Sequence, residues 1–353
     1  MGYRYIGSKE KLAPSIIQII KSELPNAKTA IDLMAGTGSM SSSLCRAGYI
    51  VTASDVMTYS YHHLMVNIKM TKTPSFNGLV GYIPTIEMND EFNYERVLSY
   101  LNSLPPVKGY FYTEFSPCGS PISSSKPRCY YSSENASKID AIRLTIKKWF
   151  SEGLITDMEH SLLLHNLILD SNDIANIAGT YGHYLSHFVQ RSLEPIVLKP
   201  ITSPCMENGD LHHVTQGYAE DIAVTLSADF CYIDPPYIKR QYAANYHILE
   251  TLAREDCPEA IGESGLRPWR DQYSNFCSKI KIRSSFDKIL QGVNTKDFFI
   301  SYSEDGLLSL EELTNFLSQY GEVKLFTIEH KRFKSNNSLK SPVIIEYLFH
   351  LHK

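Results

Sequence analysis

The stretch "TAIDLMAGTGS", residues 29–39, places a short apolar run directly before a turn that contains Gly36 and Gly38. The run is rich in strand-forming residues, and the residues after the turn have a helical pattern. A second apolar run, "YIVTASD" (49–55), predicts another strand. Two such strands separated by one helix predict a β-α-β unit, because parallel strands are joined by a crossover of this kind.

The same alternation extends outward in both directions. Apolar residues at four-residue spacing predict a helix over 9–24, with Ser8 as its N-cap and Pro25 at its end. Further strands are predicted at 228–234, 297–303, 323–330 and 343–351, and further helices at 57–70, 244–255, 270–290 and 309–319. The fold class is therefore α/β, with a mostly parallel sheet that ends in an antiparallel hairpin.

The alternation stops between about 72 and 215, where Pro- and Ser-rich loops and helices replace it. The least regular part is "SPCGSPISSSKPRCYYSS" (116–133). We therefore predict one sheet domain, formed by 1–71 and 216–353, interrupted by an inserted region at 72–215.

The composition argues against a uniformly basic protein, a membrane protein and a disulfide-rich protein. The 353 residues are 43% hydrophobic and 20% charged, with a net charge of −4, which argues against a uniformly basic nucleic-acid coat. No apolar run is long enough to span a membrane, and no basic leader precedes an apolar block, so we expect an intracellular protein. The seven cysteines include no C-x-x-C pair and are expected to be reduced thiols.

Two acids and two glycines suggest a cofactor site. Asp32 ends the first strand, and Gly36 and Gly38 allow a ligand to approach the backbone and the free amides of the next helix. Asp55 ends the following strand about 20 residues on, where a carboxylate can accept both hydroxyls of a ribose. An adenosine-containing cofactor fits this pattern. A nicotinamide dinucleotide fits less well, because Ser41 stands where its fingerprint has a third glycine.

The segment "YIDPPYIKRQY" (232–242) indicates the chemistry. Pro235 and Pro236 lack an N–H and have a fixed φ, so the strand before them must stop in a rigid turn. That turn presents the Asp234 carboxylate, the prolyl carbonyls and the Tyr237 ring at the carboxyl edge of the sheet. Two acceptors beside an aromatic ring suit the exocyclic amino group of a flat base.

At these motifs the chain resembles the adenine-N6 DNA methyltransferases that use S-adenosylmethionine, in particular the alpha class with its Dam-type and type II restriction-modification members. The segments "RCYYSSENASKIDAIR" (128–143) and "RQYAANYHILETL" (240–252) resemble the restriction-modification members closely. The resemblance implies a Rossmann-like class I methyltransferase fold. It also implies that the insertion at 72–215 contains the target-recognition region.

The resemblance also assigns cofactor contacts. "YIGSK" (5–9) is similar to an N-terminal motif that wraps back over the cofactor, and "EDI" (220–222) is similar to the motif that binds its adenine, with Asp221 accepting from the amino group. A surface acid is the alternative for Asp221. The implied cofactor residues are Tyr5, Ile6, Lys9, Asp32, Ala35, Gly36, Gly38, Asp55, Val56, Asp221 and Ile222.

The catalytic residues implied are Asp234, Pro235, Pro236 and Tyr237. Asp234 and the Pro235 carbonyl would hold both N–H bonds of the target amine, which favours the pyramidal geometry needed for attack, with no covalent intermediate. The target base must be flipped out of duplex DNA. Candidate DNA contacts are Arg128, Lys138, Arg143, Lys239, Arg240 and Phe333; a core position is the alternative for Phe333.

Other functions remain open from the sequence. They are methylation of cytosine N4, methylation of RNA or of a protein amide, and a catalytically silent DNA-binding relative; Asp at 234 favours adenine by analogy with the family. The expected partners are double-stranded DNA and a restriction endonuclease encoded nearby. We expect no metal, because the sequence has no H-E-x-x-H or cysteine cluster. A monomer in the bacterial cytoplasm is expected.

Overall fold

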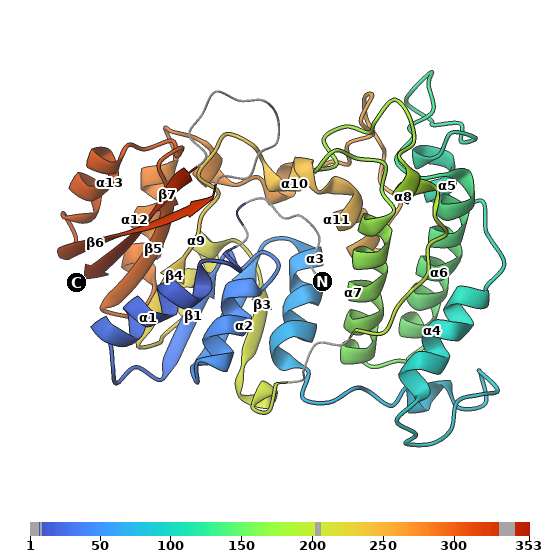
Figure 1. Ribbon diagram of the computed structural model, residues 1–353, viewed down its shortest axis with the longest axis horizontal. Coiled ribbons are helices and arrows are strands. Elements are labelled where there is room, and N and C mark those ends of the chain that lie inside the picture. Colours follow the sequence, from blue (N-terminus) through green and yellow to red (C-terminus); the bar gives the residue numbers. More distant parts are fainter. Residues whose placement is uncertain (1–6, 8, 202–205, 332–342) are drawn as a thin grey trace. The chain divides into compact units, whose positions relative to one another are not determined.

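The computed structural model describes residues 7, 9–201, 206–331 and 343–353. The chain folds into two compact units, which Figure 1 shows as a ribbon. The sheet unit comprises Ile6–Leu64, Asp210–Gln241 and Tyr273–Lys353, and the helical unit comprises Met65–Gly209 and Tyr242–Gln272.

A seven-stranded sheet forms the centre of the sheet unit, in the order β3-β2-β1-β4-β5-β7-β6. The strands β1 to β5 pair in parallel, whereas β7 runs antiparallel to both β5 and β6. This confirms the predicted class, a mostly parallel sheet ending in an antiparallel hairpin. The strands are β1 (Thr29–Leu33), β2 (Ile50–Asp55), β3 (His213–Gln216), β4 (Phe230–Ile233), β5 (Asp297–Ser303), β6 (Glu322–Lys331) and β7 (Val343–His352).

The strand order reverses between β1 and β4, which are direct neighbours with Leu33 opposite Ile233. In open sheets of this type, ligands bind beyond the carboxyl ends of the strands at such a reversal. The segments that follow β1 and β4 are the glycine turn and the Asp-Pro-Pro-Tyr turn. The topology therefore brings the two motifs together, although about 200 residues separate them in the sequence.

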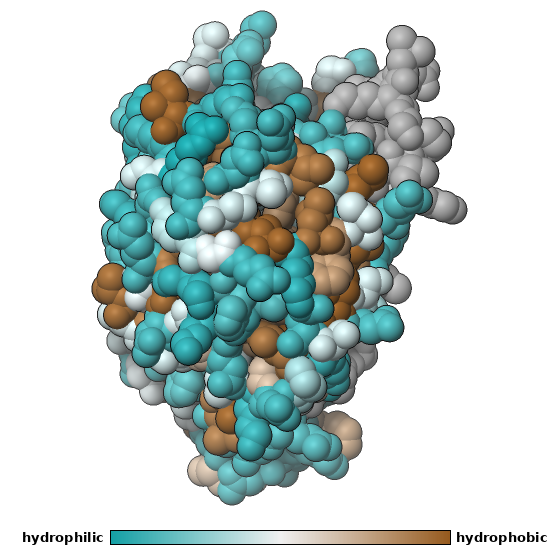
Figure 2. Space-filling view, turned by 90° about the vertical axis from the view of Figure 1, so that its left-hand side faces the viewer, coloured by the Kyte–Doolittle hydropathy of each residue, from teal (hydrophilic) through white to brown (hydrophobic). Residues whose placement is uncertain are grey.

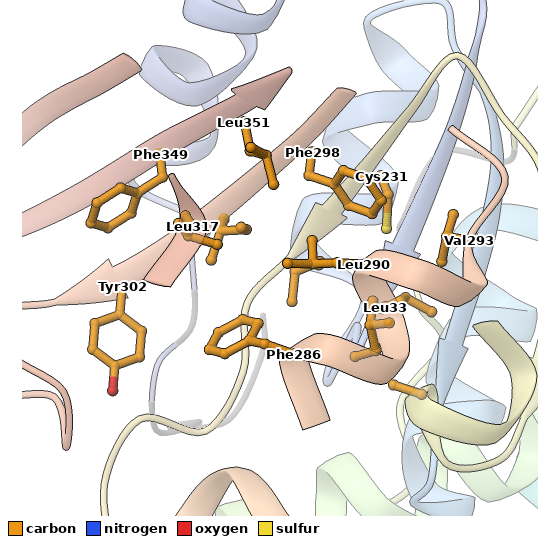
Figure 3. Close-up of a cluster of buried hydrophobic side chains, with 14 of the residues drawn as sticks. Leu33, Cys231, Phe286, Leu290, Val293, Phe298, Tyr302, Leu317, Phe349 and Leu351 are labelled. Atoms are coloured by element: carbon orange, nitrogen blue, oxygen red, sulfur yellow. The ribbon is translucent and has the colours of Figure 1, made fainter. Parts of the chain in front are cut away.

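One face of the sheet packs against α9 (Ala219–Ile222), α12 (Ile282–Gly292) and α13 (Leu310–Leu317). Alternate residues of β1, β4, β5 and β7 point to this face, as the two-residue period of a strand requires. Figure 3 shows Leu33, Cys231 and Phe298 among the side chains that meet Phe286 and Leu290 of α12. Their burial makes this the main apolar core described for the unit.

The other face is covered by α1 (Ala13–Glu23), α2 (Ser39–Arg46) and α3 (Thr58–Leu64). The sequence predicted that the first helix begins at residue 9, but it begins at Ala13. Pro14 explains the difference, because proline has no N–H and is tolerated only in the first turn of a helix. Lys9 precedes the helix, and its carbonyl accepts the N–H groups of Leu12 and Ala13.

The edge strand β6 carries charged residues at its exposed positions. Glu322 and Lys324 are exposed, and Lys324 forms an ion pair with Glu23 at 2.6 Å. Figure 2 shows this side of the molecule as largely hydrophilic with apolar side chains between, and Leu325 of β6 is 41% exposed. Charges on an edge strand oppose pairing with a second sheet.

The helical unit is built around two long antiparallel helices, α6 (Ser133–Ser151) and α7 (Asp157–Asp173). Ser132 caps α6 by accepting the N–H of Asn135, and Thr156 forms a capping box with Glu159 at the start of α7. The remaining helices are α4 (Asn93–Ser103), α5 (Tyr110–Phe115), α8 (Gln190–Leu193), α10 (Tyr242–Asn245) and α11 (His247–Ala253). Among the described helices, none has both the length and the apolar character needed to cross a membrane.

The boundaries of the helical unit differ from the predicted insertion at 72–215. The segment Tyr242–Gln272 also belongs to this unit, because α11 packs against α7 and Asn245 accepts the N–H of Tyr181 at 2.9 Å. A hydrogen bond of 2.8 Å between His160 Nε2 and the Glu255 carboxylate adds a polar contact. The predicted helix at 244–255 is divided into α10 and α11, and the one predicted at 270–290 becomes α12 only from Ile282 onward.

Candidate active site

The turn after β1 depends on backbone conformations that glycine adopts readily. Gly36 and Gly38 have φ values of 56° and 78°, and Gly38 is the N-cap of α2. The carboxylate of Asp55, at the end of β2, accepts the N–H of Gly36 and that of Met57, both at 2.8 Å. Asp55 therefore fixes the turn, and a carboxylate can accept several hydrogen bonds at once.

Asp32 lies in β1, just before this turn, and is 1% exposed. Ser41 of α2 donates its hydroxyl to Asp32 Oδ2 at 2.5 Å, so the residue that replaces the third glycine ties the helix to β1. The pKa of Asp32 is raised to about 7, chiefly by burial; the Ser41 hydrogen bond opposes the shift, and the charges of Asp234 and Asp55 add to it.

A pocket of about 310 Å³ opens beside the turn, at the carboxyl ends of β1, β2 and β3. Its wall is mainly apolar, and the volume includes space that is open to solvent. The lining residues are Met34, Asp55, Val56, Gly217, Tyr218, Ala219, Glu220, Ser274 and Phe276. Asp55, Val56 and the motif 220–222, to which Glu220 belongs, were expected here from the sequence; the segment 217–219, Ser274 and Phe276 were not.

Two adjacent acids in α9 have different environments. Glu220 lines the pocket and accepts the hydroxyl of Ser285 at 2.7 Å, whereas Asp221, the acid named from the sequence motif, is exposed. Ile222 is half-buried and packs against the apolar core. A helix of four residues has no measurable periodicity, so the sequence could not tell which acid points inward.

The Asp-Pro-Pro-Tyr turn follows β4 directly. Its Tyr237 ring packs edge-on against Tyr302 at 5.9 Å, and its carbonyl accepts the N–H of Leu307. The Asp234 side chain is 18% exposed. Its Oδ1 atom accepts no hydrogen bond from any described residue. Burial raises the pKa of Asp234 to about 7, although the positive charge of Lys9 opposes the shift.

Lys9 lies at the centre of a buried cluster of charges. Its Nζ atom is 2.7 Å from Glu346 Oε1 and 3.2 Å from Asp234 Oδ1, and 5.2 Å from the centre of the Tyr237 ring. Burial alone would lower the pKa of Lys9, but the charges of Asp234, Tyr237 and Glu346 outweigh it and raise the pKa well above the usual value. The sequence indicated Lys9 as a site residue but not Glu346.

Three of the basic residues proposed as DNA contacts are bonded within the helical unit. Arg128 is fully buried and forms an ion pair with Glu114, and Arg143 is buried against Asp140. Lys138 is directed to the carbonyls of Asn102 and Leu104. A phosphate contact needs an exposed cation, so burial argues against Arg128 and Arg143 in this role, whereas the half-buried Lys138 stays a candidate.

Lys239 and Arg240, by contrast, are exposed directly after the Asp-Pro-Pro-Tyr turn. Tyr5, Ile6 and Phe333 lie outside the described residues. Within the described ranges, no group of three His, Cys, Asp or Glu side chains is arranged to hold a metal ion.

Residues 5–316 match the D12 class N6 adenine-specific DNA methyltransferases, and the chain belongs to this family. The resemblance noted in the motifs is thereby confirmed, with S-adenosylmethionine as the cofactor of such enzymes. Among curated relatives, the type II methyltransferase M.FokI of Planomicrobium okeanokoites is 32% identical over 99% of this chain. The modification methylase StsI of Streptococcus sanguinis and the type II methyltransferase M.NlaIII of Neisseria lactamica are each 31% identical over 99%.

The relatives differ in length. The chain spans 52% of M.FokI and 52% of StsI, but 99% of M.NlaIII. The present chain therefore corresponds to about half of the first two proteins.

Proposed function

We propose that the protein transfers the methyl group of S-adenosylmethionine to N6 of an adenine flipped out of duplex DNA. The observation that carries this proposal is the buried Asp234 carboxylate, whose Oδ1 is 3.2 Å from the Lys9 ammonium, beside Pro235 and Tyr237 at the strand reversal. A carboxylate has about four acceptor sites, so this ion pair leaves Asp234 able to accept from a ligand. An exocyclic amine is a donor that suits this acceptor.

The pocket beside β2 fits the nucleoside part of the cofactor. Asp55 can accept from ribose hydroxyls, Glu220 can accept from an adenine amino group, and the apolar wall with Phe276 can cover the base. The glycine turn lets the cofactor approach the backbone closely. When bound, the cofactor supplies an activated methyl group on its sulfonium.

The residues of the Asp-Pro-Pro-Tyr turn act on the target amine. Asp234 and the Pro235 carbonyl accept its two N–H bonds and stabilise the positive charge that develops on the nitrogen. The Tyr237 ring stacks on the extruded base and offsets part of the cost of unstacking it. Catalysis on this account is positioning and electrostatics, since no side chain forms a covalent bond to the substrate.

The helical unit is our candidate for target recognition, with Lys239 and Arg240 of the sheet unit as phosphate contacts. The names of the relatives support a further assignment, that of the modification enzyme in a type II restriction-modification system with a cognate endonuclease. We propose that the enzyme acts as a monomer, modifying one strand at each visit.

The two acids of α9 give a matched pair of variants. Glu220→Ala is expected to weaken binding of S-adenosylmethionine roughly tenfold, because one hydrogen bond to a charged acceptor in the pocket is lost. Asp221→Ala should change the dissociation constant less than about twofold, since Asp221 is exposed. Isothermal titration calorimetry measures both. The opposite ranking would place Asp221 at the cofactor.

A pH dependence follows from the pKa of Asp234, which burial raises to about 7. Only the carboxylate accepts from the amine, so kcat/KM should fall about tenfold per pH unit below that value. Asp32 titrates in the same range, and the affinity for S-adenosylmethionine, measured at each pH, separates its effect from that of Asp234. A rate that stays constant down to pH 5 would contradict the assignment of Asp234.

The class of acceptor is tested in three separate reactions, each containing the protein and methyl-labelled S-adenosylmethionine. The first also contains unmethylated genomic DNA, the second total RNA and the third a protein extract. We expect label in DNA only. Label in RNA or protein would overturn the substrate, and cofactor binding without transfer to any acceptor would indicate a silent DNA-binding relative.

A further inference from the structure

Glu346 is a carboxylate in the middle of the apolar strand β7, and it is 2% exposed. Burying a charge is expensive unless a partner compensates it. Two partners are present: Ser301 of β5 donates its hydroxyl to Glu346 Oε1 at 2.8 Å, and Lys9 forms an ion pair with the same oxygen at 2.7 Å. In the register of β5 and β7, Glu346 is opposite Ser303, so Ser301 is its diagonal neighbour on the same face of the sheet.

Lys9 is shared unequally between two carboxylates. Its ion pair with Glu346 is 0.5 Å shorter than the one with Asp234, which is 3.2 Å long. One ammonium group thus faces two acids. Its position between them determines how many acceptor sites of the Asp234 carboxylate a second donor can use.

We propose that Glu346, oriented by Ser301, is a positioning residue for methyl transfer: it holds the Lys9 ammonium to one side, so that Asp234 Oδ1 stays available to the target amine. The proposal rests on the function proposed above for Asp234. Without Glu346, Lys9 has Asp234 as its one remaining carboxylate partner among the described residues and competes with the amine for it.

The charged and titratable groups around Asp234 come from several elements. Lys9 precedes α1, Glu346 lies on β7, Asp32 lies on β1, and Tyr232 and Tyr237 belong to β4 and its turn. Glu346 raises the pKa of Asp234 and Lys9 lowers it, after the larger effect of burial. Glu346→Gln removes the first influence and strengthens the second, so both changes lower the pKa of Asp234.

The kinetic test compares Glu346→Gln with Glu322→Gln, which removes an exposed carboxylate from the neighbouring strand β6. We expect Glu346→Gln to move the acid limb of kcat/KM about one pH unit lower and to reduce kcat on the plateau roughly tenfold. Ser301→Ala should act in the same direction but less, and Glu322→Gln should match the wild type. A reduced rate with an unshifted acid limb would overturn the proposal and leave Glu346 a structural residue.

A second measurement needs no turnover. Because the pKa of Asp234 is raised in the folded state, its contribution to stability is full at low pH and is lost as pH rises towards 7. The free energy of unfolding of the sheet unit can be measured in denaturant, with amide protection in β4 and β5 as the signal. Between pH 5 and 7 this free energy should decrease less in Glu346→Gln than in the wild type. In the Asp234→Asn background, Glu346→Gln should leave the pH dependence unchanged.

The two measurements separate the inference from the proposed function. A changed stability profile in a protein that methylates nothing would support the coupling of Glu346 to Asp234 and reject the function. If the protein methylates DNA but Glu346→Gln changes neither the pH dependence of kcat/KM nor that of the free energy of unfolding, the coupling is rejected and the proposed function stands.

Discussion

Asp234→Ala is expected to lower kcat by roughly 10³-fold while binding of S-adenosylmethionine changes less than about threefold. Removing one preorganised group that stabilises transition-state charge typically has an effect of this order. Asp234 is the acceptor placed at the strand reversal, whereas the pocket expected to hold the nucleoside is lined by other residues. Single-turnover methylation and equilibrium dialysis measure the two quantities.

A control for this variant is Asp305→Ala, which removes a carboxylate from the loop after β5 and is expected to retain transfer. Asp234→Asn adds a comparison, because it keeps the size of the side chain and removes its charge. Full activity in both Asp234 variants would show that the amine is held elsewhere.

Arg128→Met is expected to reduce the free energy of unfolding of the helical unit by about 3–5 kcal/mol, the usual cost of breaking a buried ion pair. Arg128 is fully buried, bonded to Glu114 and to the carbonyls of Ala260 and Gly262. Its removal leaves the Glu114 carboxylate uncompensated. Both tryptophans, Trp149 and Trp269, belong to this unit, so tryptophan fluorescence during urea unfolding follows it specifically.

Two further variants sharpen this experiment. The double variant Arg128→Met/Glu114→Leu should recover much of the lost stability, because replacing a buried ion pair by apolar residues is often neutral. Lys126→Met removes an exposed cation two residues away and should leave unfolding unchanged. Normal stability of Arg128→Met, together with weaker DNA binding, would restore the interpretation of Arg128 as a DNA contact.

The sheet could be predicted from the sequence because each strand is a short apolar run followed by a turn or helix signal. β3 is the exception: His213–Gln216 is a four-residue strand of mostly polar, half-exposed residues, and it gives no such run. The helical unit was predicted as an insertion of loops and helices, without bounds for its individual helices. Its inclusion of Tyr242–Gln272 depends on packing against α7, which no local pattern records.

The candidate site was predictable where a motif surrounds the residue, as at Asp32, Gly36, Asp55 and Asp234. Glu346 was missed although an acid inside the apolar strand "VIIEYLFHL" (343–351) is itself a signal of a buried partner. Arg128 shows the reverse case: the sequence named it as a DNA contact, but the structure buries its side chain. A basic residue in a polar loop has the same sequence pattern whether it is exposed or buried, and only the tertiary fold distinguishes the two.

The most direct test of the central claim is to identify the methylated atom. Unmethylated genomic DNA is incubated with the purified protein and S-adenosylmethionine, digested to nucleosides and examined by mass spectrometry, with Asp234→Ala as the control. The account predicts N6-methyladenine with the wild type and none above background with the variant. N4-methylcytosine, or equal N6-methyladenine from both proteins, would contradict it.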